Sequence, residues 1–168
     1  MALGGQGAPL APFFHFACAK YVGAIEPIAF LNLGGVGNIT YVDPRLDDVT
    51  DQGAVLAFDT GPANAPLNDF VMARLGRAYD ANGALAATGT PDMDVVRAFL
   101  NAPYFRKLPP KSLDRNSFPQ IEELVAHMTD ADGAATLCAI IAATVATGME
   151  HMPAPAVSYT HLTLPTKA

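Results

Sequence analysis

The sequence predicts an α/β fold in which three short strands are followed by helices. Short apolar and β-branched runs, bounded by Gly, Pro and Asp, occur at residues 28–33, 39–42 and 55–58, as is typical of strands. Apolar residues recur at helical spacing through much of the later sequence. Of the 168 residues, 51% are hydrophobic, which is enough to bury a core in a single domain.

The elements follow one another in a simple order. A short helix is predicted at residues 12–20, where Phe13, Phe16 and Ala17 share one face. The predicted strands are joined by residues 34–37 and 43–48. Helices are then predicted at 67–75, 93–100, 118–128 and 134–149, several of them after Asp, Pro or Ser in a starting position. The last segment is very apolar, but it is shorter than the roughly 20 residues that span a bilayer, so we interpret it as a buried helix.

Two glycine-containing segments have the composition of phosphate-binding turns. The first is Gly34-Gly35-Val36-Gly37, flanked by Asn32 and Asn38, and the second is the run from Asp59 to Asn64. Because glycine has no Cβ, backbone N–H groups can approach a phosphate closely. The first turn is not a dinucleotide fingerprint, since a β-branched strand follows it and not a helix. The sequence also contains no P-loop motif.

Each of these segments has a structural alternative. The glycines could form only a tight hairpin turn, and the Asn32 and Asn38 amides could cap that turn instead of holding phosphate or a magnesium-bound water. Asp59 and Thr60 are predicted to end a strand just ahead of a helix, whose N-terminus favours an anion. Either residue could instead serve only as the N-cap of that helix.

Four motifs, in this order and spacing, resemble those of anhydro-N-acetylmuramic acid kinases. They are GGQGAPL at residues 4–10, NLGGVGN at 32–38, DTGPAN at 59–64 and PKSLDRNSF at 110–118. That family phosphorylates 1,6-anhydro-N-acetylmuramic acid with ATP and opens the anhydro ring with water, giving N-acetylmuramic acid 6-phosphate for cell-wall recycling. The resemblance implies an incomplete ribonuclease-H-like lobe of the actin, hexokinase and Hsp70 type, with residues 1–152 forming part of a C-terminal lobe.

The resemblance also implies where the substrates bind. Gly5, Gln6 and Gly7 would face the sugar, and Lys111 and Arg115 would meet phosphate or the lactyl carboxylate. ATP would be the co-substrate together with Mg²⁺, which Asp59 would hold indirectly. The residues implied to bind the nucleotide phosphates are Asn32, Gly34, Gly35, Gly37, Asn38, Asp59, Thr60, Gly61 and Asn64.

The sequence departs from the family pattern at two places. Ala63 stands where many members have Gly, which weakens the expectation of close backbone approach there. Leu113, Asp114 and Asn116 differ from the commoner sequence, so the loop with Lys111 and Arg115 could equally be a salt-bridged structural loop. Tyr104, Phe105 and Phe118 are interpreted as packing residues, and no role is assigned to His15, His127 or His151.

Other parts of the family's site have no counterpart in these residues. By its spacing, the catalytic aspartate would fall immediately before Met1, so no catalytic residue is predicted and we expect the chain alone to be inactive. Residues 153–168 resemble a translated sequencing adapter more than native sequence; a genuine proline-containing tail is the alternative, and neither gives them a role in a core. Residues 28–33 are then expected to form an unpaired strand edge.

Charge and composition argue against nucleic-acid binding and against a membrane-spanning protein. The net charge of −6 lacks the basic surface that binds nucleic acid, and no signal-peptide or membrane-spanning pattern is predicted. We therefore expect a cytoplasmic protein with no nucleic-acid or membrane partner. The resemblance implies that it binds an amino sugar and ATP and that the intact enzyme forms a homodimer. The alternatives are a non-catalytic sugar- or nucleotide-binding module and another sugar kinase of the same superfamily.

Overall fold

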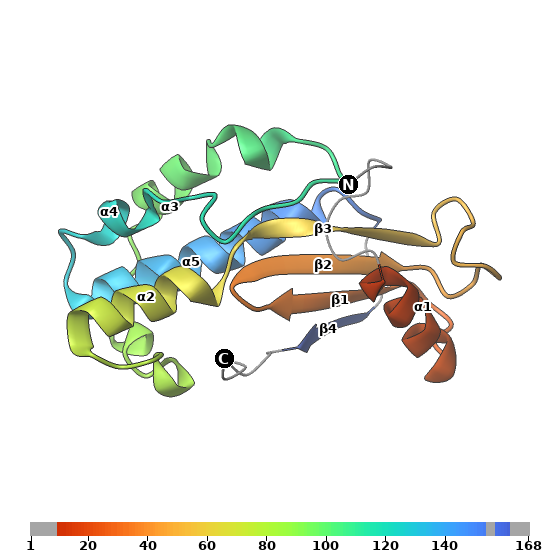
Figure 1. Cartoon of the computed structure of the whole chain (residues 1–168), viewed down its shortest axis with the longest axis horizontal. Helices are drawn as coiled ribbons and strands as arrows, with labels where there is room; N and C mark the ends of the chain where they lie inside the picture. The colour runs from red at the N-terminus through yellow and green to blue at the C-terminus, as the bar shows by residue number, and fades with distance from the viewer. Residues whose placement is uncertain (1–9, 154–156, 162–168) are drawn as a thin grey trace.

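A four-stranded sheet forms the centre of the computed structural model, which describes residues 10–153 and 157–161 (Figure 1). Its strands are β1 (Ile28–Leu33), β2 (Val36–Val42), β3 (Val55–Pro62) and β4 (Val157–His161), in the order β3-β2-β1-β4. β2 is antiparallel to β1 and β3, whereas β4 is parallel to β1. Three of the four strands therefore point the same way.

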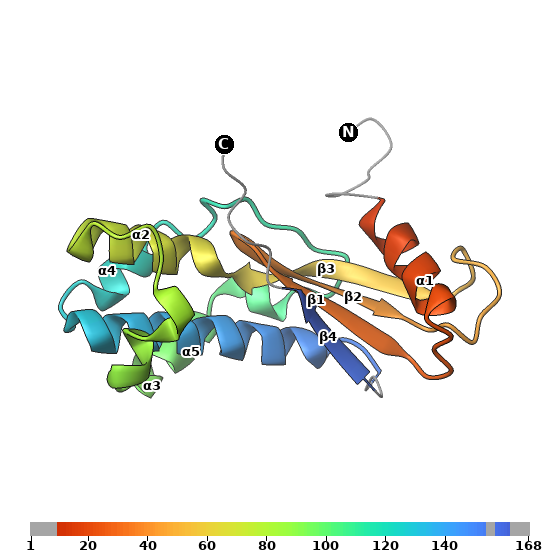
Figure 2. The same ribbon diagram turned by 90° about the horizontal axis from the view of Figure 1, so that it is seen from below.

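Two helices cover opposite faces of this sheet, as Figure 2 shows. On one face α1 (Ala11–Tyr21) packs Phe16 and Ala19 against Ile28 and Val42. On the other, the C-terminal end of α5 (Asp130–Met149) lies against β3, and Ile39, Tyr41 and Phe58 are buried there. The alternation of inward-facing residues along β1 and β2 thus serves two separate apolar layers.

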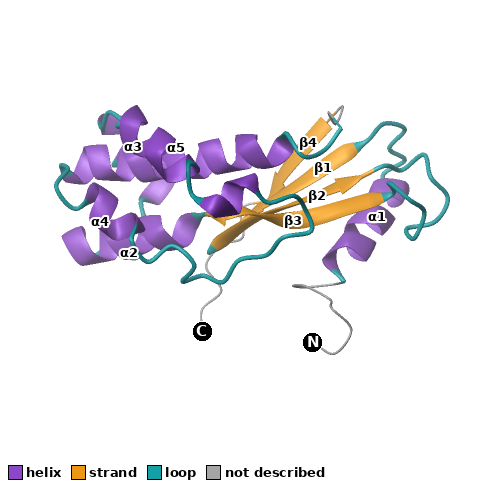
Figure 3. Cartoon of the chain, turned by 90° about the horizontal axis from the view of Figure 1, so that it is seen from above, coloured by secondary structure: helices purple, strands orange, loops and turns teal. Residues whose placement is uncertain are grey.

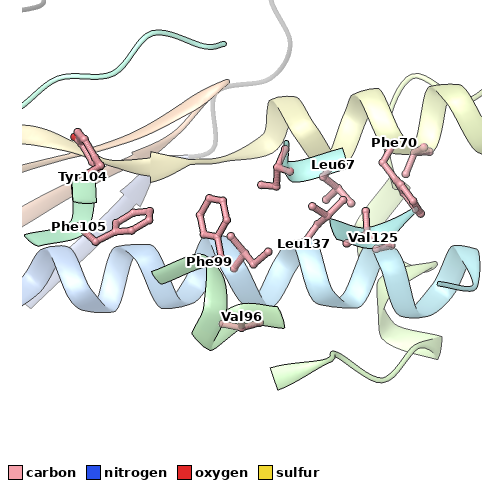
Figure 4. Packing of buried hydrophobic residues seen from close by; sticks show 12 residues of the cluster. Leu67, Phe70, Val96, Phe99, Tyr104, Phe105, Val125 and Leu137 are labelled. Atoms are coloured by element: carbon pink, nitrogen blue, oxygen red, sulfur yellow. The ribbon is translucent and has the colours of Figure 1, made fainter. Parts of the chain in front are cut away.

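A second core lies beyond the sheet, where α5 extends past the strands. It is enclosed by α2 (Asn64–Leu75), α3 (Met93–Leu100) and α4 (Ile121–Val125) (Figure 4). Three short 3-10 helices, η1 (Ala81–Gly83), η2 (Ala86–Thr88) and η3 (Pro103–Arg106), complete this half. The labelled core side chains are Leu67, Phe70, Val96, Phe99, Tyr104, Phe105, Val125 and Leu137.

Side-chain caps define where two of these helices begin. The Asp92 carboxylate accepts the N–H groups of Asp94 and Val95 at the start of α3, and the Thr129 hydroxyl accepts that of Asp132 at the start of α5. These bonds satisfy donors that have no partner within the helix. Within the described residues, α5 alone is long and apolar enough to cross a membrane, but 56% of that window is buried in the protein. The helix begins at Asp130 and has 20 residues, so it is longer than predicted, but the interpretation as a buried helix is confirmed.

Several predicted boundaries need correction. β1 and α3 have the predicted ends, but β2 begins at Val36, so the connecting turn is only Gly34-Gly35. β3 continues to Pro62, through the whole Asp-Thr-Gly motif. The single helix predicted at residues 118–128 is wrong, because only α4, Ile121–Val125, is α-helical there. A proline at 119 and the new helix start at 129–130 confine it.

The expectation of an unpaired edge at β1 is also wrong. β4 pairs with β1 in parallel from Ile28 opposite Val157 to Asn32 opposite His161. Five of the residues in 153–168 thus belong to the sheet, as the strand Val157–His161. The physical reason is that Val, Tyr and Thr favour a strand and that the open side of β1 offers unpaired backbone groups. Their non-native origin stays a prediction.

Candidate functional site

Three polar residues lie side by side across neighbouring strands of the sheet. Asn32 of β1 is opposite Asn38 of β2, and Asn38 is opposite Asp59 of β3. Directly opposed residues project from the same face of a sheet, so these three form one row, here called the polar row. With neighbouring strands about 4.8 Å apart, the polar row spans about 10 Å. The sheet thus brings together three of the predicted phosphate-binding residues.

The polar row lies on the α1 face but at the opposite end of the strands from the contact with that helix. α1 packs near Ile28 and Val42, whereas Asn32 and Asn38 adjoin the β1–β2 turn. All three members of the polar row are partly exposed. A ligand at this end of the sheet would meet two amides and one carboxylate.

Backbone and side-chain bonds hold Asp59 from three directions. Its carboxylate Oδ2 accepts the N–H of Leu113 at 2.7 Å, and its own N–H donates to the carbonyl of Lys111 at 3.0 Å. Its carbonyl accepts the Tyr104 hydroxyl at 2.6 Å. Burial raises the pKa of the Asp59 carboxyl above its ordinary value, and the Leu113 bond opposes that rise. The loop that supplies Lys111 and Leu113 runs along β3 (Figure 3).

The N-cap alternative for Asp59 and Thr60 is wrong. Both residues lie inside β3, and the N-cap of α2 is Ala63. Gly37 is opposite Gly61 and Asn38 is opposite Asp59, so Thr60 is the extra residue of a β-bulge. The sequence could not show the bulge, because it depends on the pairing of two strands.

The bulge places Thr60 in the interior, away from the polar row. Its side chain is 1% exposed, and no hydrogen-bond partner for Oγ1 is present in the described part of the chain. A Cβ on Gly37 would come within 2.7 Å of Thr60 Oγ1, and one on Gly61 within 2.7 Å of Thr144 Cβ. Gly37 and Gly61 therefore permit close packing of β2, β3 and α5.

The β1–β2 turn is hydrogen-bonded to the start of α2. The carbonyls of Gly34 and Gly35 accept the N–H groups of Asn64 and Ala63, at 2.8 and 3.1 Å. The Asn64 side-chain amide donates to the carbonyl of Leu33. Pro66, in the first turn of α2, has no N–H at all. The N–H groups of Ala63 and Asn64, at the start of α2, thus bind the β1–β2 turn. The sequence predicts an anion at this helix start.

Neither Lys111 nor Arg115 reaches the polar row. Lys111 is 6% exposed, and its Nζ lies 3.4 Å from Nε2 of His151. Arg115 donates to both carboxylate oxygens of Asp69 in α2, each at 3.0 Å. The exposed Arg115 pair matches the salt-bridged loop that was the alternative for this segment. Gly5, Gln6 and Gly7 lie outside the described residues.

The polar row has a suitable donor set for an indirectly held magnesium ion. Magnesium prefers oxygen ligands and usually keeps several of its waters, and the polar row supplies one carboxylate and two amide oxygens. In the described ranges, no group of three or more His, Cys, Asp or Glu side chains is placed to hold a metal directly. These oxygens could hold a hydrated ion only through its bound waters.

The groups that hold Asp59 carry no recognisable signal in the sequence. Tyr104 is predicted only as a packing residue. Leu113 acts through its backbone N–H, which leaves no signal in residue type. Since Leu113 and Tyr104 are 54 and 45 residues from Asp59, no local pattern could have connected them.

Comparison with known proteins gives a uniform result. The family model described as anhydro-N-acetylmuramic acid kinase matches residues 1–159. Proteins of that name are similar to this chain in Ruegeria sp. (60% identical over 91% of this chain), Roseobacter denitrificans (62% over 90%) and Cereibacter sphaeroides (58% over 92%). The match covers 41%, 40% and 42% of those relatives. The chain thus spans about two fifths of the length of the curated relatives it matches.

Proposed function

The chain belongs to the anhydro-N-acetylmuramic acid kinase family, and on that premise we propose that it is part of an enzyme acting on 1,6-anhydro-N-acetylmuramic acid. The reaction would transfer the γ-phosphoryl group of ATP to the sugar and open its anhydro ring with water, giving N-acetylmuramic acid 6-phosphate. The polar row is the observation that most directly supports a phosphate-handling role for these residues.

In this reaction the polar row would bind the nucleotide phosphates. The amide groups of Asn32 and Asn38 can donate to phosphate oxygens, and the Asp59 carboxylate can accept from water bound to Mg²⁺. Phosphoryl transfer depends mainly on positioning and charge stabilisation, which are the contributions that such a rigid row of groups can make. Mg²⁺ would supply neutralisation of the phosphate charge.

We also propose that the sheet belongs to a ribonuclease-H-like lobe. The order β3-β2-β1-β4, with β2 the one antiparallel strand among those described, supports this assignment. A cytoplasmic location and a homodimer of the intact enzyme remain proposals. The use of ATP supports the cytoplasm, where that nucleotide is available.

A chimaeric kinase tests the proposed function. The matching 153-residue segment of the Ruegeria kinase is replaced by the corresponding residues of this chain, and ADP release is measured with 1,6-anhydro-N-acetylmuramic acid. We expect turnover, and we expect Asp59→Asn in the chimaera to lower kcat/KM by about tenfold to a hundredfold, the usual cost of removing an outer group at a metal–phosphate site. Arg97→Ala, on the exposed surface of α3, is the matched control.

Two results would contradict the proposal. A folded chimaera without activity would show that these residues do not serve this kinase reaction, and an Asp59→Asn chimaera with unchanged kcat/KM would remove Asp59 from the site. We propose in addition that the 168-residue chain alone is inactive, because it spans only two fifths of its relatives. Turnover by the isolated chain above a no-enzyme blank would refute that proposal.

A further inference from the structure

Lys111 occupies an unusual place for a lysine. Its side chain is 6% exposed, and its Nζ lies 4.9 Å from the ring centre of Tyr104 and 5.7 Å from that of Phe58. The fourth member of this group is His151, whose Nε2 is 3.4 Å from Nζ. We call Lys111, Phe58, Tyr104 and His151 the lysine cage. Over the described ranges, Lys111 forms no ion pair.

Burying an ammonium group without a carboxylate is costly. Burial lowers the pKa of Lys111 from its ordinary value. Two aromatic faces offset part of that cost through cation–π attraction, which is stronger in a desolvated place. The side chain thus makes specific contacts on three sides, and it is not a solvated surface cation that could be replaced freely.

Two residues of the lysine cage, Lys111 and Tyr104, also form hydrogen bonds with Asp59. The carbonyl of Lys111 accepts the Asp59 N–H at 3.0 Å, and Tyr104 donates its hydroxyl to the Asp59 carbonyl at 2.6 Å. Two residues after Lys111, the N–H of Leu113 donates to the Asp59 carboxylate at 2.7 Å. One short segment therefore connects the buried ammonium to the carboxylate.

The two ends of this connection lie on opposite faces of the sheet. Phe58 and Asp59 are neighbours in β3, so their side chains project to opposite sides. Phe58 is buried on the α5 face with Ile39 and Tyr41, whereas Asp59 belongs to the polar row on the α1 face. Lys111 is thus separated by the sheet from any ligand at the polar row.

We propose that Lys111 is a positioning residue, whose buried ammonium fixes residues 111–113 along the edge of β3 and thereby orients the Asp59 carboxylate in the polar row. This inference rests on the proposed binding of nucleotide phosphates at the polar row. It assigns Lys111 a function different from direct contact with substrate. It also explains why the segment beside Asp59 carries a lysine that does not reach solvent.

Hydrogen exchange in the ¹⁵N-labelled 168-residue chain tests the inference. Lys111→Met removes the charge and keeps an apolar stem of similar length, and Lys107→Met does the same at an exposed position of the same loop. We expect the Leu113 amide to exchange about tenfold faster in Lys111→Met, whereas the slowest amides of α5 should exchange at the same rate as in the unmodified chain. In Lys107→Met, the exchange rate of Leu113 should not change. We also expect the affinity for MgADP to fall about tenfold.

A second variant keeps the test decisive if Lys111→Met does not fold. His151→Ala removes the partly exposed imidazole beside Nζ and should speed Leu113 exchange in the same direction. Unchanged Leu113 exchange in the folded variants would overturn the inference, and so would a loss of protection spread evenly over α5, which would indicate a purely stabilising role. If the unmodified chain binds no MgADP, the proposed phosphate site fails, whereas the Leu113 result still decides whether Lys111 holds the segment.

Discussion

Asp59, a member of the polar row, forms hydrogen bonds through its carboxylate, its N–H and its carbonyl. It is partly buried, its carboxylate has one backbone donor, and its pKa is raised because burial disfavours the charged form. An ionised Asp59 therefore costs stability at neutral pH in the absence of a ligand. A bound cation would relieve that cost, which is a reason for such a group to occur at a magnesium–phosphate site.

Asp59→Asn should make the unliganded chain more stable at neutral pH. The folded protein binds the Asp59 proton more tightly than the unfolded chain, so stability falls as pH rises from the ordinary Asp value through the raised folded value. Asparagine can still accept the Leu113 N–H but carries no charge. Urea unfolding of both proteins between pH 3.5 and about 7 measures this.

The stability advantage of Asp59→Asn should therefore be greatest near pH 7 and shrink as the pH approaches the ordinary Asp value of 3.8. An advantage that grows on acidification would mean that the folded pKa is lowered. That outcome would mean that a favourable contact, and not burial, has the larger effect on the pKa of Asp59.

At the scale of elements, glycines decide how closely the strands and α5 can pack. The first turn was expected to need several glycines for phosphate approach. In the structure Gly35 has free space, since an added Cβ would meet only Ala65 Cβ at 3.6 Å. Gly37 has none, because Thr60 Oγ1 of the β-bulge lies only 2.7 Å from the position that a Cβ would take. Two glycines of one motif thus have different structural requirements.

Gly37→Ala should lower the free energy of unfolding by about 1–3 kcal/mol, the usual cost of overpacking. Combining it with Thr60→Ala should restore most of that loss, because the second change removes the clashing oxygen. Gly35→Ala is the matched control and should change stability by less than about 0.5 kcal/mol. Chemical denaturation of the unmodified chain, Gly37→Ala, Thr60→Ala and the double variant measures the coupling. Strictly additive effects at 37 and 60 would contradict the described bulge.

At the scale of the whole molecule, the sequence predicts where helices and strands lie better than it predicts which of them touch. A bounded apolar run predicted β1, and helical spacing predicted α3 and the buried α5, because these patterns report where apolar residues gather. They could not predict the polar row as one surface, since register depends on the hairpin and the bulge. The burial of Lys111 beside His151, 40 residues later in the sequence, could not be predicted either, because it depends on a long-range contact.

A titration of the ¹⁵N-labelled chain with MgADP tests the central claim most directly, namely that the polar row binds nucleotide phosphates. The account predicts that the side-chain amide signals of Asn32 and Asn38 and the backbone signal of Asp59 move together on one binding curve. Omitting Mg²⁺ or introducing Asp59→Asn should weaken that curve by about tenfold. Binding that moves signals elsewhere and leaves these three unchanged would contradict it.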